Sequence, residues 1–378
     1  MKRSMAVGLI IALACSGNDS VELIPSTPPI PDTPLHPDLQ PAAMVSPAVK
    51  IAGEAPVDLD TSAITAAEQL RLLEFAIPGT LENCGAGAPF PHDPAVDAAT
   101  GLVYYTDTLR HCIGQFNPET LEFRAWPTAT AEAEPHGLVV VDGVVYYTGW
   151  VANILGRVDP TAGTSEDFPV AVADPHTPTW QRGAVWFTGG ARQYGRFDPL
   201  TTTTELFDFP SDQSGPYGIA PAPDGSLWVA LFGTNRLARI DTSASPPAAE
   251  EFVLPAADAR PRRLAVDAQG KVWYSNYTGG EIGVLDPGAA EGREFRQFRT
   301  PRGGRPYGIA IGPDQRVWYG DQDAAEVVGF DPASETVVAE LPITTASPGP
   351  LRNMAADPEH QRIWISLSDV GVLGVIQF

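Results

Sequence analysis

The 378-residue sequence has little positive charge, few cysteines and no apolar run of membrane-spanning length. Its 24 lysines and arginines are outnumbered by 46 aspartates and glutamates, which leaves a formal net charge of −22. No basic stripe offsets this charge, so phosphate backbones are repelled and nucleic-acid binding is excluded. The apolar run at residues 5–14 is too short to span a bilayer, so we expect membrane attachment only through a lipid anchor.

The N-terminal residues follow the order of an export signal. Lys2 and Arg3 precede the apolar run, which ends immediately before Cys15. This end resembles the cleavage box of bacterial lipoproteins, although Ala12 stands where a larger aliphatic residue is usual. We predict a signal peptide of lipoprotein type over residues 1–15, lipidation of Cys15, and export to the bacterial cell envelope, either the periplasm or the outer membrane. Simple signal cleavage is the alternative.

Prolines crowd the segment after the signal, where the chain reads VELIPSTPPIPDTPLHPDLQPAA. This density favours an extended tether over a packed element. We therefore predict a disordered linker over residues 16–62 and a folded domain over residues 63–378.

Turn-forming residues are abundant throughout the domain and recur with a period. The chain has 38 prolines and 36 glycines, too many for a helical protein, and 43% hydrophobic residues for a core. One sequence motif recurs, as in GPYGIAPAPDGSLW and RPYGIAIGPDQRVW. Its proline recurs every 40 to 45 residues, at Pro91, Pro135, Pro175, Pro216, Pro261, Pro306 and Pro350. This period is typical of a four-stranded propeller blade, and seven registers predict seven blades.

Each repeat divides into four short strands separated by turns rich in Asp, Gly and Pro; in the fifth repeat they are RLAV, KVWYS, EIGVLD and EFRQF. An aromatic residue holds the same place in every second strand, and packing between blades explains it better than a ligand cage. These residues are Tyr104, Tyr146, Trp186, Trp228, Trp273, Trp318 and Trp364.

The two ends of the chain complement each other. The last repeat stops after its third strand, in GVLGVIQF. The stretch LLEFAIP, residues 72–78, has the pattern of a fourth strand but no first three strands of its own. We therefore predict an all-β, seven-bladed β-propeller of four-stranded antiparallel blades, with the last blade closed by this N-terminal strand.

The residue after each recurrent proline opens the first strand of its blade and is expected to point at the mouth of the central channel. Around the ring these residues are His92, His136, His176, Tyr217, Arg262, Tyr307 and Leu351. Asp107 and Asp321 end second strands and are expected on the same face. Such a convergence of titratable groups predicts a binding site, in which Arg262 and its neighbour Arg263 could hold a carboxylate.

A divalent metal, such as Mg²⁺, is one possible occupant of this site. Three histidines that face one space, together with Asp107 or Asp321, offer suitable ligands. The alternative is that each imidazole caps a loop carbonyl, since the sequence has no HExxH or CxxC-type cluster.

Two cysteines lie beyond the signal, Cys84 in the connection into the first repeat and Cys112 at the start of its third strand. Both positions belong to the face of the channel mouth, so we predict a disulfide between them, as an exported protein permits. Two separate buried thiols are the alternative.

The repeats, including VWFTGGARQYGRFDP, closely resemble blades of the virginiamycin B lyase family over roughly residues 72–378. The resemblance implies an enzyme that uses magnesium and a histidine base to open a cyclic depsipeptide ester by β-elimination. In that family the site comes from Pro-His starts of first strands, and from a glutamate after the W-[FY]-T of a second strand with a histidine two residues beyond. Pro-His is present at His92, His136 and His176, but no second strand is followed by that glutamate or histidine.

Two functions are consistent with these observations. The first is an exported, lipid-anchored, monomeric propeller whose channel mouth binds a small molecule or a protein, with His92, Tyr217, Arg262 and Tyr307 as ligand-binding residues. The second is a metal-dependent carbon–oxygen lyase of the virginiamycin B lyase type, with His136 and His176 as catalytic residues and Asp107 and Asp321 at the metal. A calcium-dependent lactonase of the gluconolactonase type is less favoured, because no convergent Glu, Asn and Asp set is found.

Overall fold

The computed structural model describes residues 49–50, 57–58, 70–290, 294–345 and 351–378. All of them belong to one of the two units into which the chain divides, residues 48–378. The predicted signal peptide, Cys15 and most of the predicted linker lie outside the described residues. Within the described ranges, no helix is long and apolar enough to cross a membrane.

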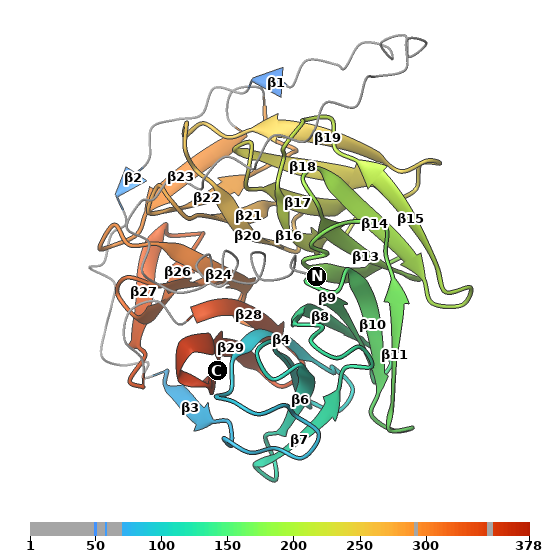
Figure 1. Cartoon of the computed structure of the whole chain (residues 1–378). Helices are drawn as coiled ribbons and strands as arrows, with labels where there is room; N and C mark the ends of the chain where they lie inside the picture. Colours follow the sequence, from blue (N-terminus) through green and yellow to red (C-terminus); the bar gives the residue numbers. More distant parts are fainter. Residues whose placement is uncertain (1–48, 51–56, 59–69, 291–293, 346–350) are drawn as a thin grey trace, which may run out of the picture. The chain divides into compact units, whose positions relative to one another are not determined.

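Seven four-stranded antiparallel sheets form the seven predicted blades (Figure 1). Blade 1 contains β4 (Pro91–Val96), β5 (Val103–Asp107), β6 (Cys112–Asn117) and β7 (Glu122–Pro127). Blade 2 contains β8 (Pro135–Val141), β9 (Val144–Gly149), β10 (Ile154–Asp159) and β11 (Thr164–Pro169). Blade 3 contains β12 (Pro178–Gln181), β13 (Ala184–Gly189), β14 (Gln193–Asp198) and β15 (Thr203–Asp208).

The second half of the ring repeats this order. Blade 4 contains β16 (Pro216–Pro221), β17 (Leu227–Leu231), β18 (Arg236–Asp241) and β19 (Ala248–Val253). Blade 5 contains β20 (Pro261–Val266), β21 (Val272–Asn276), β22 (Glu281–Leu285) and β23 (Phe295–Arg299). Blade 6 contains β24 (Pro306–Ile311), β25 (Val317–Asp321), β26 (Glu326–Asp331) and β27 (Thr336–Pro342). The first strands of neighbouring blades contact one another around the whole ring.

Blade 7 joins the two ends of the domain, as predicted. It contains β28 (Leu351–Asp357), β29 (Arg362–Leu367), β30 (Val372–Gln377) and β3 (Leu72–Ala76). The register of β3 against β30 runs antiparallel from Leu72 opposite Ile376 to Ala76 opposite Val372. The Glu74 carboxylate also accepts hydrogen bonds from the backbone N–H and the hydroxyl of both Thr344 and Thr345, after β27. The N-terminal strand therefore completes the ring.

Two short strands lie inside the range predicted as linker. β1 (Val49–Lys50) pairs parallel with β19, and β2 (Val57–Asp58) pairs parallel with β23. Each adds a fifth strand to its sheet, in blades 4 and 5. Residues 49–50 and 57–58 thus pair with the fourth strands of these two blades.

The core lies between blades, where the second-strand aromatics pack. Trp318 of blade 6 shares a buried cluster with Ile363 and Ile365 of blade 7. Glycines of the third strands leave space for another aromatic side chain from the second strand: a Cβ on Gly114 would lie 2.0 Å from the Tyr105 ring. The repeated aromatics are therefore structural, as the sequence predicts.

Candidate functional site at the channel mouth

The first strands are irregular directly after their recurrent prolines. In β4 the register passes from Pro91 opposite Asp107 to Pro94 opposite Tyr105, which leaves His92 and Asp93 between them. Similar shifts occur in β8, β16, β20, β24 and β28. An extra residue in a strand redirects side chains. Two successive residues per blade, rather than one, are thereby available to the neighbouring blades.

Four rings from consecutive blades stand side by side at the mouth. Ring centroids are 3.8 Å apart for His92 and His136, and 3.9 Å apart for His136 and His176. The next ring, Tyr217, lies 3.9 Å from His176, and its hydroxyl contacts that of Tyr307. The structure thus brings together the predicted imidazoles and phenols.

Arg262 lies among four aromatic rings on the other side of this arc. Its guanidinium carbon is 4.2 Å from the ring centre of Tyr277 and 4.9 to 5.4 Å from those of Phe232, Tyr307 and Tyr217. Its Nη1 donates to the Tyr307 hydroxyl at 3.2 Å, and its Nε is buried without a partner. Within the described residues, Arg262 has no carboxylate partner.

The neighbouring Arg263 bridges three blades. Its Nη2 donates to Asp93 in blade 1 at 2.8 Å, and its Nη1 donates to the Thr177 hydroxyl in blade 3 at 3.1 Å. Nδ1 of His92 lies 2.9 Å from the same Asp93 oxygen, and Nδ1 of His176 lies 2.9 Å from the Thr177 hydroxyl. This buried network holds two imidazoles of the arc through a residue from the far side of the ring.

The environment keeps the imidazoles uncharged. Burial lowers the pKa of His92, His136 and His176, and the positive charge of Arg263 lowers it further in each case. Hydrogen bonding to Asp93 acts in the opposite direction at His92 without restoring its ordinary pKa. Nδ1 of His136 is buried without a partner. At pH 7 the arc therefore presents neutral rings.

The carboxylate of the network stays ionised. Burial alone would raise the pKa of Asp93, but the Arg263 guanidinium and the His92 imidazole hold it below its ordinary value. Asp93 is therefore already engaged by a cation and a hydrogen-bond donor.

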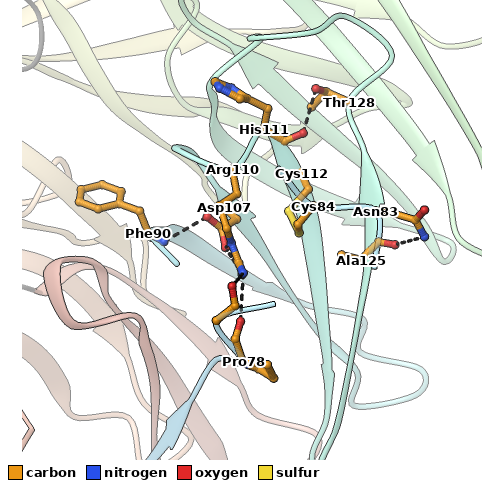
Figure 2. The surroundings of a disulfide bond; sticks show 11 residues. Pro78, Asn83, Cys84, Phe90, Asp107, Arg110, His111, Cys112, Ala125 and Thr128 are labelled. Atoms are coloured by element: carbon orange, nitrogen blue, oxygen red, sulfur yellow. Dashed lines mark hydrogen bonds and ion pairs between the residues drawn. A yellow bond between two sulfur atoms is a disulfide. The ribbon is translucent and has the colours of Figure 1, made fainter. Parts of the chain in front are cut away.

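The structure gives Asp107 a different setting from the predicted one. Its Oδ2 accepts from Arg110 Nε at 2.9 Å and Nη2 at 2.7 Å, and its Oδ1 accepts from the Phe90 N–H at 3.0 Å. Figure 2 shows this ion pair beside the disulfide that joins Cys84 and Cys112, whose Cα atoms are 5.3 Å apart. Asp107 is thus part of a buried ion pair that organises the loop into blade 1.

Asp321 likewise serves the turn that follows its strand. It accepts hydrogen bonds from the amides of Asp323 at 3.0 Å and Ala324 at 3.1 Å. It stands opposite Glu326, and burial raises the pKa of both carboxyls, that of Glu326 to about 7. No hydrogen bond or ion pair joins Asp107 or Asp321 to the imidazole arc among the described residues.

The residues at the mouth do not fit a magnesium ion. Mg²⁺ is bound by oxygens, chiefly carboxylates, phosphates and water. The mouth instead presents neutral imidazoles, phenols and the guanidinium groups of Arg262 and Arg263. Among the described residues, no group of three or more His, Cys, Asp or Glu side chains could hold a metal. Guanidinium groups are suited to carboxylates and phosphates.

Several residues of the site escape the sequence analysis because they lie one place beyond the residue after the proline. They are Asp93, Thr177 and Arg352. The signal was present, since this second position carries a polar or charged residue in four of the seven blades and glycine in the other three. Hydroxyls near the ends of second strands also support the site by donating to the carbonyls of His136, His176, Tyr217 and His92; they belong to Thr106, Thr148, Thr188 and Ser366.

A Glu-x-His sequence is present outside the second strands, at Glu134 and His136. The Glu134 carboxylate accepts from Trp150 Nε1 at 3.0 Å, and the Trp150 ring lies 5.4 Å from the His136 ring. The Glu134 N–H donates to His111 Nδ1 at 3.3 Å. Glu134 therefore holds Trp150 near His136, a role that scanning only the second strands does not reveal.

Comparisons with known proteins agree with this architecture. The model of the virginiamycin B lyase family matches residues 93–291. A structure of virginiamycin B lyase from Staphylococcus aureus is 21% identical, with a TM-score of 0.71, over 82% of this chain and 100% of that chain. A catalytically inactive form of that enzyme with quinupristin is 20% identical, with a TM-score of 0.71, over 82% and 100% of the two chains.

Other solved structures of lower identity also match. Hydrazine synthase from Kuenenia stuttgartiensis is 15% identical, with a TM-score of 0.64, over 80% of this chain and 99% of that chain. No curated protein matches the chain. At these identities, likeness to the solved structures shows the fold alone.

Proposed function

Since the chain belongs to the virginiamycin B lyase family, and its channel mouth gathers guanidinium groups, we propose that it binds a small organic anion there. The anionic group, a carboxylate or a phosphate, pairs with Arg262, and the organic part lies against the rings of the arc. One observation carries this proposal: Arg262 is held among four rings with no carboxylate partner in the described part of the chain. A cation in such surroundings gains from an incoming anion.

The test is calorimetric titration of the purified domain with acetate, benzoate and inorganic phosphate. We expect Arg262→Gln to weaken binding about 10- to 100-fold, the range for loss of a charged hydrogen bond. Arg124→Gln is the matched control, because it makes the same charge change at a side chain that is 68% exposed and pairs with Glu122. Equal affinities for the two variants would remove the basis of the proposal.

A second function is supported by His136. This imidazole is neutral, lies between two others, and has a buried Nδ1 without a partner. In β-elimination it would take the proton α to a carbonyl, the C–O bond of the ester would break, and an alkene and a carboxylate would form, after which the imidazolium would return its proton to the carboxylate or to solvent. The charge of Arg262 would stabilise the developing enolate. A lowered pKa keeps the base unprotonated but reduces its strength.

This lyase function predicts ring opening of a cyclic depsipeptide, followed by mass spectrometry. His136→Ala should abolish turnover while the melting temperature shows an intact fold. His360→Ala is the control, since His360 pairs with Asp357 in a turn outside the arc. Turnover that survives in His136→Ala would exclude this histidine as the base, and absence of turnover in the wild type would leave anion binding as the function.

We also propose that the protein is exported and anchored through Cys15. The order of Lys2, Arg3, the apolar run and Cys15 supports this location. A mature N-terminus at Cys15 carrying acyl chains, seen by mass spectrometry, is the expected result; cleavage elsewhere would contradict it. A protein ligand and a monomeric state stay predictions.

A further inference from the structure

Tyr307 lies where the positive charge of the channel converges. It is 1% exposed and belongs to β24. Its hydroxyl accepts from Arg262 Nη1 at 3.2 Å and contacts the hydroxyl of Tyr217. The oxygen of Tyr307 is thus placed between a guanidinium group and a phenol.

The groups that face Tyr307 from the surrounding elements are phenols and arginines. They are Tyr217 from β16, Arg262 and Arg263 from β20, Tyr277 after β21, and Arg352 from β28. Two of these arginines have carboxylate partners, Asp93 at Arg263 and Asp369 at Arg352. Burial would raise the pKa of Tyr307, but the three arginines outweigh it, so the pKa is lowered. Burial raises the pKa of Tyr217, so Tyr217 keeps its proton when Tyr307 ionises and can then donate it in a hydrogen bond to the Tyr307 oxygen.

We propose that the Tyr307 oxygen is the internal counter-ion of Arg262 and that it competes with a bound anion for this guanidinium group. This inference rests on the proposed anion-binding function and adds its regulation by pH. When the Tyr307 O–H bond breaks, the proton passes to solvent and the phenolate takes the place of an external anion beside Arg262. A ligand anion is then repelled by the phenolate of Tyr307, and Arg262 is no longer available to pair with it. Binding of an anion and ionisation of Tyr307 are therefore mutually exclusive.

Thermodynamic linkage between proton binding and anion binding gives the size of the pH effect on anion affinity. If anion binding requires one proton to stay on Tyr307, affinity is constant at low pH and falls about tenfold per pH unit once Tyr307 ionises in the free protein. Saturating anion must raise the pH at which the phenolate appears, because linkage is reciprocal.

Absorbance of tyrosinate near 295 nm tests the proposal without an assay of turnover. Seven other tyrosines have a pKa raised by burial, so ionisation of Tyr307 should precede theirs; they are Tyr104, Tyr105, Tyr147, Tyr194, Tyr217, Tyr274 and Tyr319. The wild type, Tyr307→Phe and Tyr194→Phe are titrated with and without benzoate. Tyr194→Phe is the control, because its phenol bonds to the Pro247 carbonyl in a different part of the ring.

We expect an early one-tyrosine step in the wild type and in Tyr194→Phe, its loss in Tyr307→Phe, and an upward shift of the step with benzoate. Tyr217→Phe, which removes the donor to the phenolate, should move the step upward and keeps the test available if Tyr307→Phe does not fold. Persistence of the step in Tyr307→Phe, or benzoate affinity independent of pH, would overturn the inference. Benzoate that fails to bind at any pH would instead overturn the proposed function, while the titration of the ligand-free protein still decides whether Tyr307 ionises early.

Discussion

At the scale of single residues, the unusual feature is a set of buried imidazoles in positive surroundings. Histidines near a carboxylate ordinarily gain protons on folding, but His92, His136 and His176 resist protonation because burial and Arg263 oppose the charged form. The folded state then binds fewer protons than the unfolded state, whose histidines have a pKa of about 6.5. This difference makes stability depend on pH.

The direction of that dependence follows from linkage. A group with a lowered folded pKa contributes full stability above the unfolded value of about 6.5, and the contribution is lost as the pH falls below it. Asp93 also has a lowered pKa, but its contribution is lost only below the unfolded aspartate value of about 3.9. Between pH 7 and pH 5 Glu326 acts in the opposite direction, because its pKa is raised to about 7 and the folded state gains stability by binding this proton.

We expect the unfolding free energy to fall between pH 7 and pH 5, because the three histidines, at up to about 1.4 kcal/mol per pH unit each, outweigh the opposite contribution of Glu326. His136→Gln, which cannot take up a proton, should flatten the slope in urea unfolding at a series of pH values. His360→Gln, outside the arc, should keep the wild-type slope. Equal pH slopes for the wild type and His136→Gln would show that His136 is protonated as readily when folded as when unfolded.

At the scale of elements, one short strand decides whether the ring is closed. β3 pairs with β30 over its five residues, and Glu74 ties it to the segment after β27 through Thr344 and Thr345. Without β3, the backbone edge of β30 is exposed. An exposed edge strand invites pairing with another chain.

Truncation tests this closure. A chain that begins at residue 79 should melt at a lower temperature and aggregate, because it lacks β3. A chain that begins at residue 70 is the matched control: it lacks β1 and β2 but keeps β3, and it should stay monomeric in light scattering. Equal melting temperatures and equal solubility for the two chains would contradict the role of β3.

At the scale of the whole molecule, a chain of net charge −22 carries a channel mouth that is locally positive. Arg262, Arg263 and Arg352 come from first strands of blades 5 and 7 and meet near the arc. The net charge of the whole chain therefore does not predict the charge at the channel mouth. Under the proposed function, this local positive charge attracts the anionic ligand.

Thermal denaturation distinguishes an anionic ligand from a metal cation. We expect millimolar Mg²⁺, Mn²⁺ or Zn²⁺ to leave the melting temperature unchanged and benzoate or phosphate to raise it, since a ligand at 100 times its Kd stabilises by about 2.7 kcal/mol. The Arg262→Gln variant should lose the response to anions. A rise with Mg²⁺ that EDTA reverses would restore the metal site implied by the family resemblance.

Much of the fold follows from local sequence. The 40- to 45-residue period, the turn residues and the alternating strands recur in every blade, because each blade buries its apolar faces against its two neighbours in the same way. The missing fourth strand of the last repeat and the spare strand at 72–78 likewise indicate how the ring closes. Pro-His at the start of three consecutive blades places the imidazoles together once the period is known.

Local sequence does not predict which residues pair with one another at the site. Asp93 and Arg263 are 170 residues apart, and no local pattern pairs them; they meet because closure of the ring sets blade 5 within reach of blade 1. Asp107 ends a second strand as expected, yet Arg110 three residues later occupies its carboxylate. The sequence by itself determined the number of blades, their strands and the ring positions of the polar residues, since these depend on short-range patterning. Only the tertiary structure decided which charges neutralise one another, and that Arg262 has no carboxylate partner among the described residues, because these pairings depend on distances across the ring.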